Sequence, residues 1–225
     1  MPSFWSYITN DKYAVGCTGQ TVYVYNNSNI ELARFKDIKY DYTPMFCPEH
    51  NIFVVKSTEG NIAVYSLDTM QLIKKFRFSK IDNSQDDGLC FSKDGNYFYN
   101  IEHHITGSNS CLSIYETSNF SRKKQLFISE SFNLCHIEYD NVKNGLFVLG
   151  SMRKEQSDNC SFVSVFEKDS LLNITKLTLE KFDYICAYKR LEIMGFTRKA
   201  KDYTFLPKGY DLENLEQVRL SDIIV

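Results

Sequence analysis

Apolar and polar residues alternate along several short stretches of this chain, and each stretch ends in an aromatic side chain. Alternation over about four to eight residues is typical of a β-strand that buries one face. The aromatic ends follow one another after 40, 50 and 51 residues, so the pattern predicts a structural repeat. The four stretches are Thr21–Tyr25, Asn61–Tyr65, Cys111–Tyr115 and Phe162–Phe166.

A second pattern precedes each of these strands: an apolar strand, a polar turn and another apolar strand. Residues 46–54 and 91–99 align without a gap, 45 positions apart, and Asp94 and Gly95 supply the turn in the latter. Because an Asp-Gly pair allows the positive φ of a tight turn, the two flanking strands are predicted to pair as a hairpin. Residues 7–15 fit the same frame with Asn10 and Asp11 at the turn, and residues 135–148 fit it with two extra turn residues.

A fourth apolar strand follows a short polar turn after each aromatic end, so every repeat holds four strands. Sheets that are apolar on both faces must be covered on both, and a ring of blades does this without long open edges. The repeat therefore predicts an all-β fold, a β-propeller of about five four-stranded antiparallel blades. The ring is either closed or open, and the repeat suits both. The predicted fourth strands are Glu31–Phe35, Gln71–Phe76, Lys124–Ile128 and Thr175–Leu179.

No linker separates the repeats, so we expect a single domain over residues 1–225. The last repeat is the least regular. Its third strand is either Asp202–Leu206 or a stretch that reaches Tyr210, and the similarity of Leu212–Leu215 to Leu67–Met70 favours the second choice. The five units are 1–38, 39–80, 81–131, 132–181 and 182–225.

The repeat resembles a degenerate form of the WD40 family of β-propellers. In that family the third strand of a blade ends in Trp-Asp; this chain keeps an aromatic residue there but lacks the aspartate. The family's Gly-His signature is also absent, so the hydrogen-bond network that it builds from His and Asp is not expected. The resemblance covers nearly the whole chain and implies a propeller fold. The corresponding pairs are Tyr25-Asn26, Tyr65-Ser66, Tyr115-Glu116 and Phe166-Glu167.

The charge pattern and the cysteines narrow the class of protein. The formal net charge is -2, and no long run of basic residues occurs. Because nucleic-acid binding depends on basic surfaces, we expect no nucleic-acid partner. The first ten residues lack the features of a secretory signal, and no apolar run is long enough for a transmembrane helix. We therefore expect a cytoplasmic protein without a membrane partner. Its seven cysteines form no Cys-x-x-Cys pair, and we expect them to be reduced thiols that fill the core.

Neither a cofactor nor a metal site is predicted. No phosphate loop, dinucleotide fingerprint, zinc-protease motif or nucleophile elbow occurs. The segment 82–88 resembles a calcium loop, but Asp87 stands where the turn needs glycine and Lys93 where it needs a bidentate carboxylate. His103 and His104 would point to opposite faces of a strand, although a loop could turn both inward.

The alternative that the sequence leaves open is a small five-bladed propeller that uses carboxylates in its channel, either as a hydrolase or as a carbohydrate-binding protein. Propeller hydrolases place a general acid and a second carboxylate about 5 to 10 Å apart around a central channel. Several acidic residues stand near predicted first strands, but no recurring acidic motif links them, and solvated turn residues are the default for aspartate. The candidates are Asp41, Asp86, Asp87, Glu138 and Asp183.

Binding through loops is the function that the sequence favours. In WD40-like propellers the connections into first strands share one rim with the loops between second and third strands, and proteins commonly dock there. Aromatic residues in those connections would be natural anchors, or they plug the contact between neighbouring blades. We expect a non-catalytic protein-binding scaffold that uses these rim loops or an exposed blade edge, with a homodimer as a further possibility. The candidate binding residues are Tyr40, Tyr42, Asp87, Phe132, Arg153, Lys154, Phe182 and Tyr184.

Overall fold

The structure is a computed structural model of the whole chain. It describes residues 2, 4–78, 88–102, 110–129, 132–140, 145–152, 160–166, 173–179, 182–193 and 196–207. Side chains are described for nearly all of these residues up to 125, and beyond that point for Ile137, Tyr139 and Leu146. The secondary structure of the described residues consists of strands and turns.

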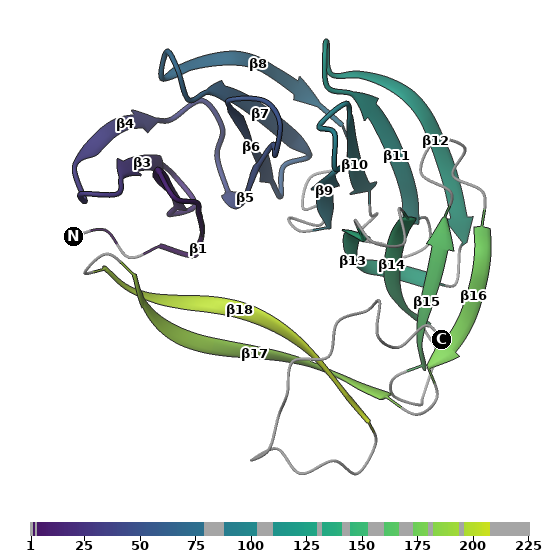
Figure 1. The fold of residues 1–225 in the computed structure, drawn as a ribbon. Helices are drawn as coiled ribbons and strands as arrows, with labels where there is room; N and C mark the ends of the chain where they lie inside the picture. Colours follow the sequence, from purple (N-terminus) through teal and green to yellow (C-terminus); the bar gives the residue numbers. More distant parts are fainter. Residues whose placement is uncertain are drawn as a thin grey trace. The chain divides into compact units, whose positions relative to one another are not determined.

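Four of the sheets are antiparallel meanders of four strands each, which is the construction of a propeller blade (Figure 1). Their strand orders are β1-β2-β3-β4, β5-β6-β7-β8, β9-β10-β11-β12 and β13-β14-β15-β16. The strands of the first two sheets are β1 Ser6–Thr9, β2 Tyr13–Cys17, β3 Val22–Asn26, β4 Glu31–Phe35, β5 Asp41–Phe46, β6 Ile52–Ser57, β7 Asn61–Ser66 and β8 Gln71–Arg77. Those of the next two are β9 Leu89–Phe91, β10 Tyr97–Glu102, β11 Ser110–Glu116, β12 Ser121–Ser129, β13 Phe132–Asp140, β14 Gly145–Met152, β15 Cys160–Phe166 and β16 Asn173–Leu179.

The sequence repeat maps onto these sheets as predicted. The aromatic-ended stretches are the third strands β3, β7, β11 and β15, and the expected fourth strands are β4, β8, β12 and β16. The predicted hairpin turn is also present, since Gly95 has a φ of 66° between β9 and β10. In the first sheet the Asn10 side chain accepts hydrogen bonds from the amides of Lys12 and Tyr13, which closes the equivalent turn.

The fifth repeat differs from its prediction within the described residues. Two long strands, β17 Phe182–Ile193 and β18 Phe196–Pro207, form a two-stranded sheet where four short strands were expected. Asp202–Leu206, one candidate for a third strand, lies inside β18; Tyr210 lies outside the described residues. Residues 182–193 contain no glycine, proline or asparagine, so nothing in their sequence favours a turn that would divide the strand.

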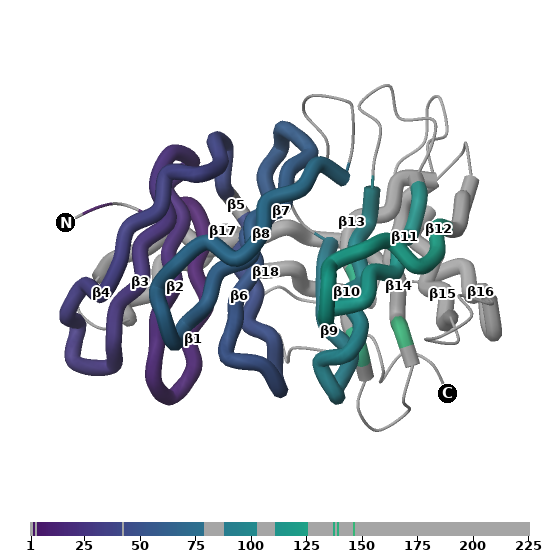
Figure 2. The backbone as a smooth tube through the Cα atoms, turned by 90° about the horizontal axis from the view of Figure 1, so that it is seen from above, coloured from purple at the N-terminus to yellow at the C-terminus, as the bar shows by residue number. Residues whose placement is uncertain are grey.

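The chain divides into two compact units, which are described separately. Unit 1 comprises Met1–Asp87 with Tyr188–Lys201, and unit 2 comprises Gly88–Ala187 with Asp202–Val225. In unit 1 the sheets β1–β4 and β5–β8 lie side by side (Figures 1 and 2). Phe53 is central to their shared core: its ring centroid lies 5.0 Å from that of Tyr65 and 6.2 Å from that of Phe35. The buried members of this core are Val15, Cys17, Val22, Val24, Phe35, Ile38, Phe53, Val55, Ala63, Tyr65 and Leu67.

Unit 2 repeats this arrangement with different side chains. Residues from β10 and β11 pack against Ile137 of β13 and Leu146 of β14, and the rings of Tyr99 and Tyr139 are stacked with centroids 6.3 Å apart. Cys90 belongs to the same core, and Cys17 and Cys47 are buried in unit 1. The prediction that cysteines serve as small core residues is confirmed for these three.

A glycine makes room for the N-terminal segment on the face of the first sheet that points away from β5–β8. A Cβ atom built on Gly16 would lie 2.5 Å from the Phe4 ring, well inside van der Waals contact. Phe4 is only 6% exposed and packs edge-on against Tyr23 and Tyr25. Gly16 is therefore required by the close approach of an aromatic ring.

We predict that Gly16→Ala destabilises the protein by about 1 to 3 kcal/mol, because the added methyl group overpacks this contact. Urea denaturation followed by tyrosine fluorescence measures the change. Adding Phe4→Leu should recover part of the loss, since the smaller side chain leaves space for the methyl group. A Gly16→Ala variant as stable as the wild type would contradict the close packing of Phe4.

Candidate functional site

The connection from β4 to β5 is bonded to turns of both sheets in unit 1. The Tyr40 amide donates a hydrogen bond to the carbonyl of Gly19 in the β2–β3 turn, with an N···O distance of 2.8 Å. The Tyr40 carbonyl accepts one from the amide of Thr58 in the β6–β7 turn, at 3.2 Å. First-strand connections and second-to-third turns therefore share one rim in this unit, as the WD40 resemblance implied. We call residues 18–21, 36–41 and 58–60 the unit 1 rim.

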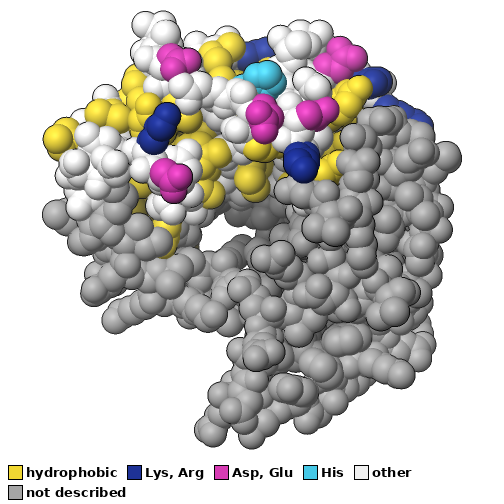
Figure 3. Space-filling view, viewed as in Figure 1, with side chains coloured by type: hydrophobic (Ala, Val, Ile, Leu, Met, Phe, Trp, Pro, Cys, Tyr) yellow, Lys and Arg dark blue, Asp and Glu magenta, His cyan; other side chains and the backbone are white. Residues whose placement is uncertain are grey.

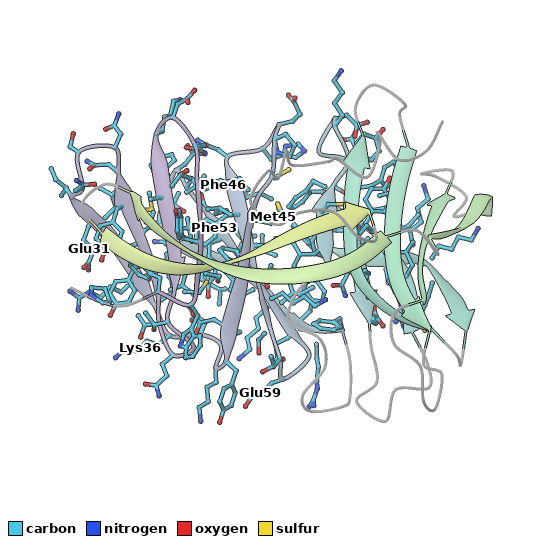
Figure 4. The ribbon with its side chains drawn as sticks, turned by 90° about the horizontal axis from the view of Figure 1, so that it is seen from below. Glu31, Lys36, Met45, Phe46, Phe53 and Glu59 are labelled. Atoms are coloured by element: carbon cyan, nitrogen blue, oxygen red, sulfur yellow. The ribbon has the colours of Figure 1, made fainter. Side chains whose placement is uncertain are left out.

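Further contacts hold the same connection in place. The Ser57 hydroxyl donates to the carbonyl of Lys39, with an O···O distance of 2.6 Å, and the Lys75 ammonium donates to the carbonyl of Asp37 at 2.6 Å. Figure 4 shows Lys36 and Glu59 at the same end of the sheets, whereas Phe46 lies toward the other end. The rim is thus a built surface in which backbone and side-chain groups from both sheets take part.

Within this connection one apolar side chain points inward and one points outward. Ile38 is 3% exposed and belongs to the core of unit 1. The Tyr40 side chain is 51% exposed. Its backbone adopts the left-handed conformation, with a φ of 53°. That conformation is costly for any residue except glycine, and to a lesser degree asparagine or aspartate. Of the two sequence alternatives for an aromatic residue here, surface anchor or interblade plug, Tyr40 fits the first.

Asp41 follows directly and is enclosed. It is the first residue of β5, pairs with Ser57 of β6 in the strand register, and is 0% exposed. Neither of its carboxylate oxygens has a hydrogen-bond partner of normal geometry within the described part of the chain. Burial raises the pKa of Asp41 to about 6, and the nearby amides of Thr18 and Gly19 and the Cys17 thiol oppose that rise only in part.

Unit 2 contains a buried carboxylate of a different kind. Glu102, at the end of β10, is 8% exposed and accepts hydrogen bonds from the Tyr115 hydroxyl at 2.9 Å and the Gln125 amide at 2.7 Å. A guanidinium nitrogen of Arg122 lies 3.8 Å from the same carboxylate. Burial, followed by the charge of Glu102, raises the pKa of the Cys111 thiol, so this cysteine is not primed as a nucleophile. These contacts satisfy the carboxylate and give it a structural role.

Tyrosine at the end of the third strand places a hydroxyl near acidic groups in both units. Tyr115 donates to Glu102, and the pKa of Tyr65 is raised by burial first and then by the charge of Asp37, with Asp41 adding to the effect. This arrangement was not predicted from the sequence. The signal was present, however, because a buried tyrosine at the end of the third strand has a hydroxyl that needs a polar neighbour.

The structure brings few of the predicted binding residues together. Tyr40 is on the unit 1 rim, and Tyr42 is two residues further along in β5, with its side chain outside the described ones. Phe132 begins β13, whereas Phe182 and Tyr184 lie in β17; nothing is described of these three side chains. Asp87, Arg153 and Lys154 lie outside the described residues.

Most of the acidic and metal-site candidates also have no described side chain. In the acidic set, only Asp41 has one; Glu138 and Asp183 lie in β13 and β17, and Asp86 lies outside the described residues. Of the metal-site candidates, His103, His104 and most of the segment 82–88 lie outside the described residues. Among the residues that the structure describes, no group of three or more His, Cys, Asp or Glu is placed to hold a metal ion. No helix in that part of the chain is long and apolar enough to cross a membrane. On the face shown in Figure 3, charged side chains of both signs are interspersed with apolar ones.

Comparison with known proteins extends only to the fold. No protein-family model and no curated protein matches the chain. Among solved structures, the hydrazine synthase of Kuenenia stuttgartiensis is similar, with a TM-score of 0.65 and 14% sequence identity over 76% of this chain and 52% of that one. The likeness is one of fold. This chain spans about half the length of that protein, and the four-stranded antiparallel sheets agree with blades of the propeller type.

Proposed function

We propose that this protein is a WD40-like propeller scaffold that binds another protein through the unit 1 rim, with Tyr40 as an anchor. The observation that carries the proposal is the combination of a costly backbone conformation with an exposed aromatic side chain at Tyr40. Strained residues that packing does not explain are concentrated at functional sites. Tyrosine is also among the residues that contribute most to protein interfaces.

A comparison within the chain supports this interpretation. Phe120 has nearly the same backbone conformation, with a φ of 52°, but it is 6% exposed and its ring packs near Phe98, with centroids 6.4 Å apart. Packing accounts for the aromatic side chain at Phe120. For Tyr40, hydrogen bonds to Gly19 and Thr58 hold the backbone, but half of its surface is open to solvent, and contact with a partner would account for an aromatic side chain there.

The proposal does not extend to catalysis. Asp41 has the raised pKa of a general acid, but it has no exposed surface, and a proton donor must come within hydrogen-bond reach of the substrate.

We predict that Tyr40→Gly abolishes partner binding without loss of stability. Glycine removes the anchor, while its freedom at positive φ offsets the entropy it adds to the unfolded chain, so stability should change by less than about 1 kcal/mol. Affinity capture with the full chain from a lysate of the source organism, quantified by mass spectrometry, measures binding. The wild type should recover a protein in stoichiometric amount, and Tyr40→Gly should not.

Leu72→Ala is the matched control, because Leu72 is a 38% exposed apolar residue on the edge strand β8, away from the rim. It should capture the same partner as the wild type. Loss of the partner in Leu72→Ala but not in Tyr40→Gly would move the binding surface to the blade edge, and equal recovery by all three proteins would refute the role of Tyr40.

A further inference from the structure

Asp41 combines three properties that do not otherwise occur together in the described part of the chain. It is fully enclosed, neither of its oxygens has a partner of normal geometry there, and it stands directly after the residue whose backbone joins the two turns of the unit 1 rim. Glu102 shows the contrast, since its neighbours donate two hydrogen bonds to its carboxylate. An ionised carboxylate without such donors is costly to bury.

The groups that face Asp41 do not compensate its charge. The amide of Asp41 itself, the Cys17 thiol on β2, which is a weak donor, and the amides of Thr18 and Gly19 oppose the effect of burial only in part. On the other side, Tyr65 of β7 is influenced by both Asp37 and Asp41, and Ser57 of β6 is uncharged. None of the groups named here as lowering the Asp41 pKa is a cation. The only inexpensive response to ionisation is for the carboxylate to reach water.

We propose that Asp41 is a proton-controlled latch: protonated, it keeps the 36–41 connection closed on the unit 1 rim, and ionised, it favours release of that connection. Release would break the two backbone hydrogen bonds of Tyr40, to Gly19 and from Thr58, because Asp41 and Tyr40 are adjacent in the chain. The carboxylate would then be solvated at the rim surface. Release would also break the pair of Asp41 with Ser57 at the start of β5 and expose Ile38, whereas the pairing of β6 with β7 lies beyond this connection.

The latch shifts the rim between two states over a mildly acidic pH interval. Burial raises the Asp41 pKa from 3.8 to about 6, so the open state gains population as the pH rises through that interval. Two pKa units correspond to roughly a 100-fold change in the opening equilibrium. Its regulatory meaning, a change in how Tyr40 is presented to a partner, rests on the proposed function; the latch itself does not.

Amide hydrogen exchange of the full chain, without any partner, tests the latch. Protection factors corrected for intrinsic exchange report the local opening equilibrium at each amide. Between pH 4 and pH 7.5 we expect the protection of the Tyr40 and Thr58 amides to fall by roughly 100-fold. The amide of Leu67, which donates to the carbonyl of Asn51 in the same unit, should keep its protection.

Two variants test whether ionisation of Asp41 causes the pH-dependent loss of amide protection. Asp41→Asn cannot ionise, so its Tyr40 and Thr58 amides should keep constant protection over the whole pH range. Asp37→Asn, a change in the same connection, should retain the wild-type pH response. The proposal is overturned if protection at Tyr40 and Thr58 does not change with pH, if Leu67 loses protection in parallel, or if Asp41→Asn behaves like the wild type. Partner capture plays no part in these readouts, so failure of the proposed function leaves them interpretable.

Discussion

Asp41→Asn should make the protein more stable at pH 7.5 by about 3 kcal/mol while leaving its stability at pH 4 nearly unchanged relative to the wild type. The physical reason is that the wild type, once ionised, must either keep a charged carboxylate enclosed or open the 36–41 connection to solvate it, whereas the amide is neutral at every pH. The size follows from a pKa raised from 3.8 to about 6 in the folded state.

The direction of the pH dependence follows from proton binding. Between pH 3.8 and about 6 the folded state binds more protons at Asp41 than the unfolded state does, so stability is fully present below this interval and is lost as the pH rises through it. Urea denaturation of both proteins at pH 4, 5, 6 and 7.5 gives the difference directly. A stability difference that is constant over this range would show that Asp41 ionises as easily in the folded protein as in the unfolded chain.

Phe53→Ala should destabilise unit 1 by about 3 to 5 kcal/mol, the usual cost of removing a buried aromatic ring from a core. The Phe53 side chain is 0% exposed, and its ring contacts Phe35, Phe46 and Tyr65, with centroids between 5.0 and 6.5 Å away. These residues come from both sheets, so the ring stabilises the contact between them. The measurement is the urea midpoint together with hydrogen exchange of β6 and β7.

The control for this prediction is Ile73→Ala, which removes apolar surface from a residue that is 54% exposed on β8. Its effect should stay within about 0.5 kcal/mol, as is usual for surface positions. Equal effects of the two substitutions would mean that Phe53 does not hold the two sheets together.

Much of the fold could be predicted because it depends on local patterns. Alternating residues such as those of Asn61–Ser66 favour a β-strand, and the Asp94-Gly95 turn requires the next strand to reverse direction. These rules operate within a few residues, so they gave the four-stranded sheets. They failed for residues 182–207, which form two 12-residue strands, because residues 182–193 contain no glycine, proline or asparagine that would divide the first of them. No local signal there marks where a short strand would end.

The candidate site was only partly predictable, because its properties arise from contacts between distant segments. Tyr40 was a candidate by its type and its place before a first strand, but its exposure and left-handed backbone depend on hydrogen bonds to Gly19 and Thr58. Asp41 was one of several acidic residues in the sequence. Only folding encloses it against Cys17 and raises its pKa.

Side-chain alternation and turn chemistry act between near neighbours, so the all-β class, the four-strand repeat and the positions of the aromatic third-strand ends could be derived from the sequence alone. Which polar groups are satisfied and which are not depends on the three-dimensional packing. Glu102 meets Tyr115 and Gln125, whereas Asp41 meets no comparable donor among the described residues, and this difference depends on the packing of neighbouring strands and sheets. Desolvation is a property of the surroundings in space, so residue type and sequence spacing alone do not reveal it.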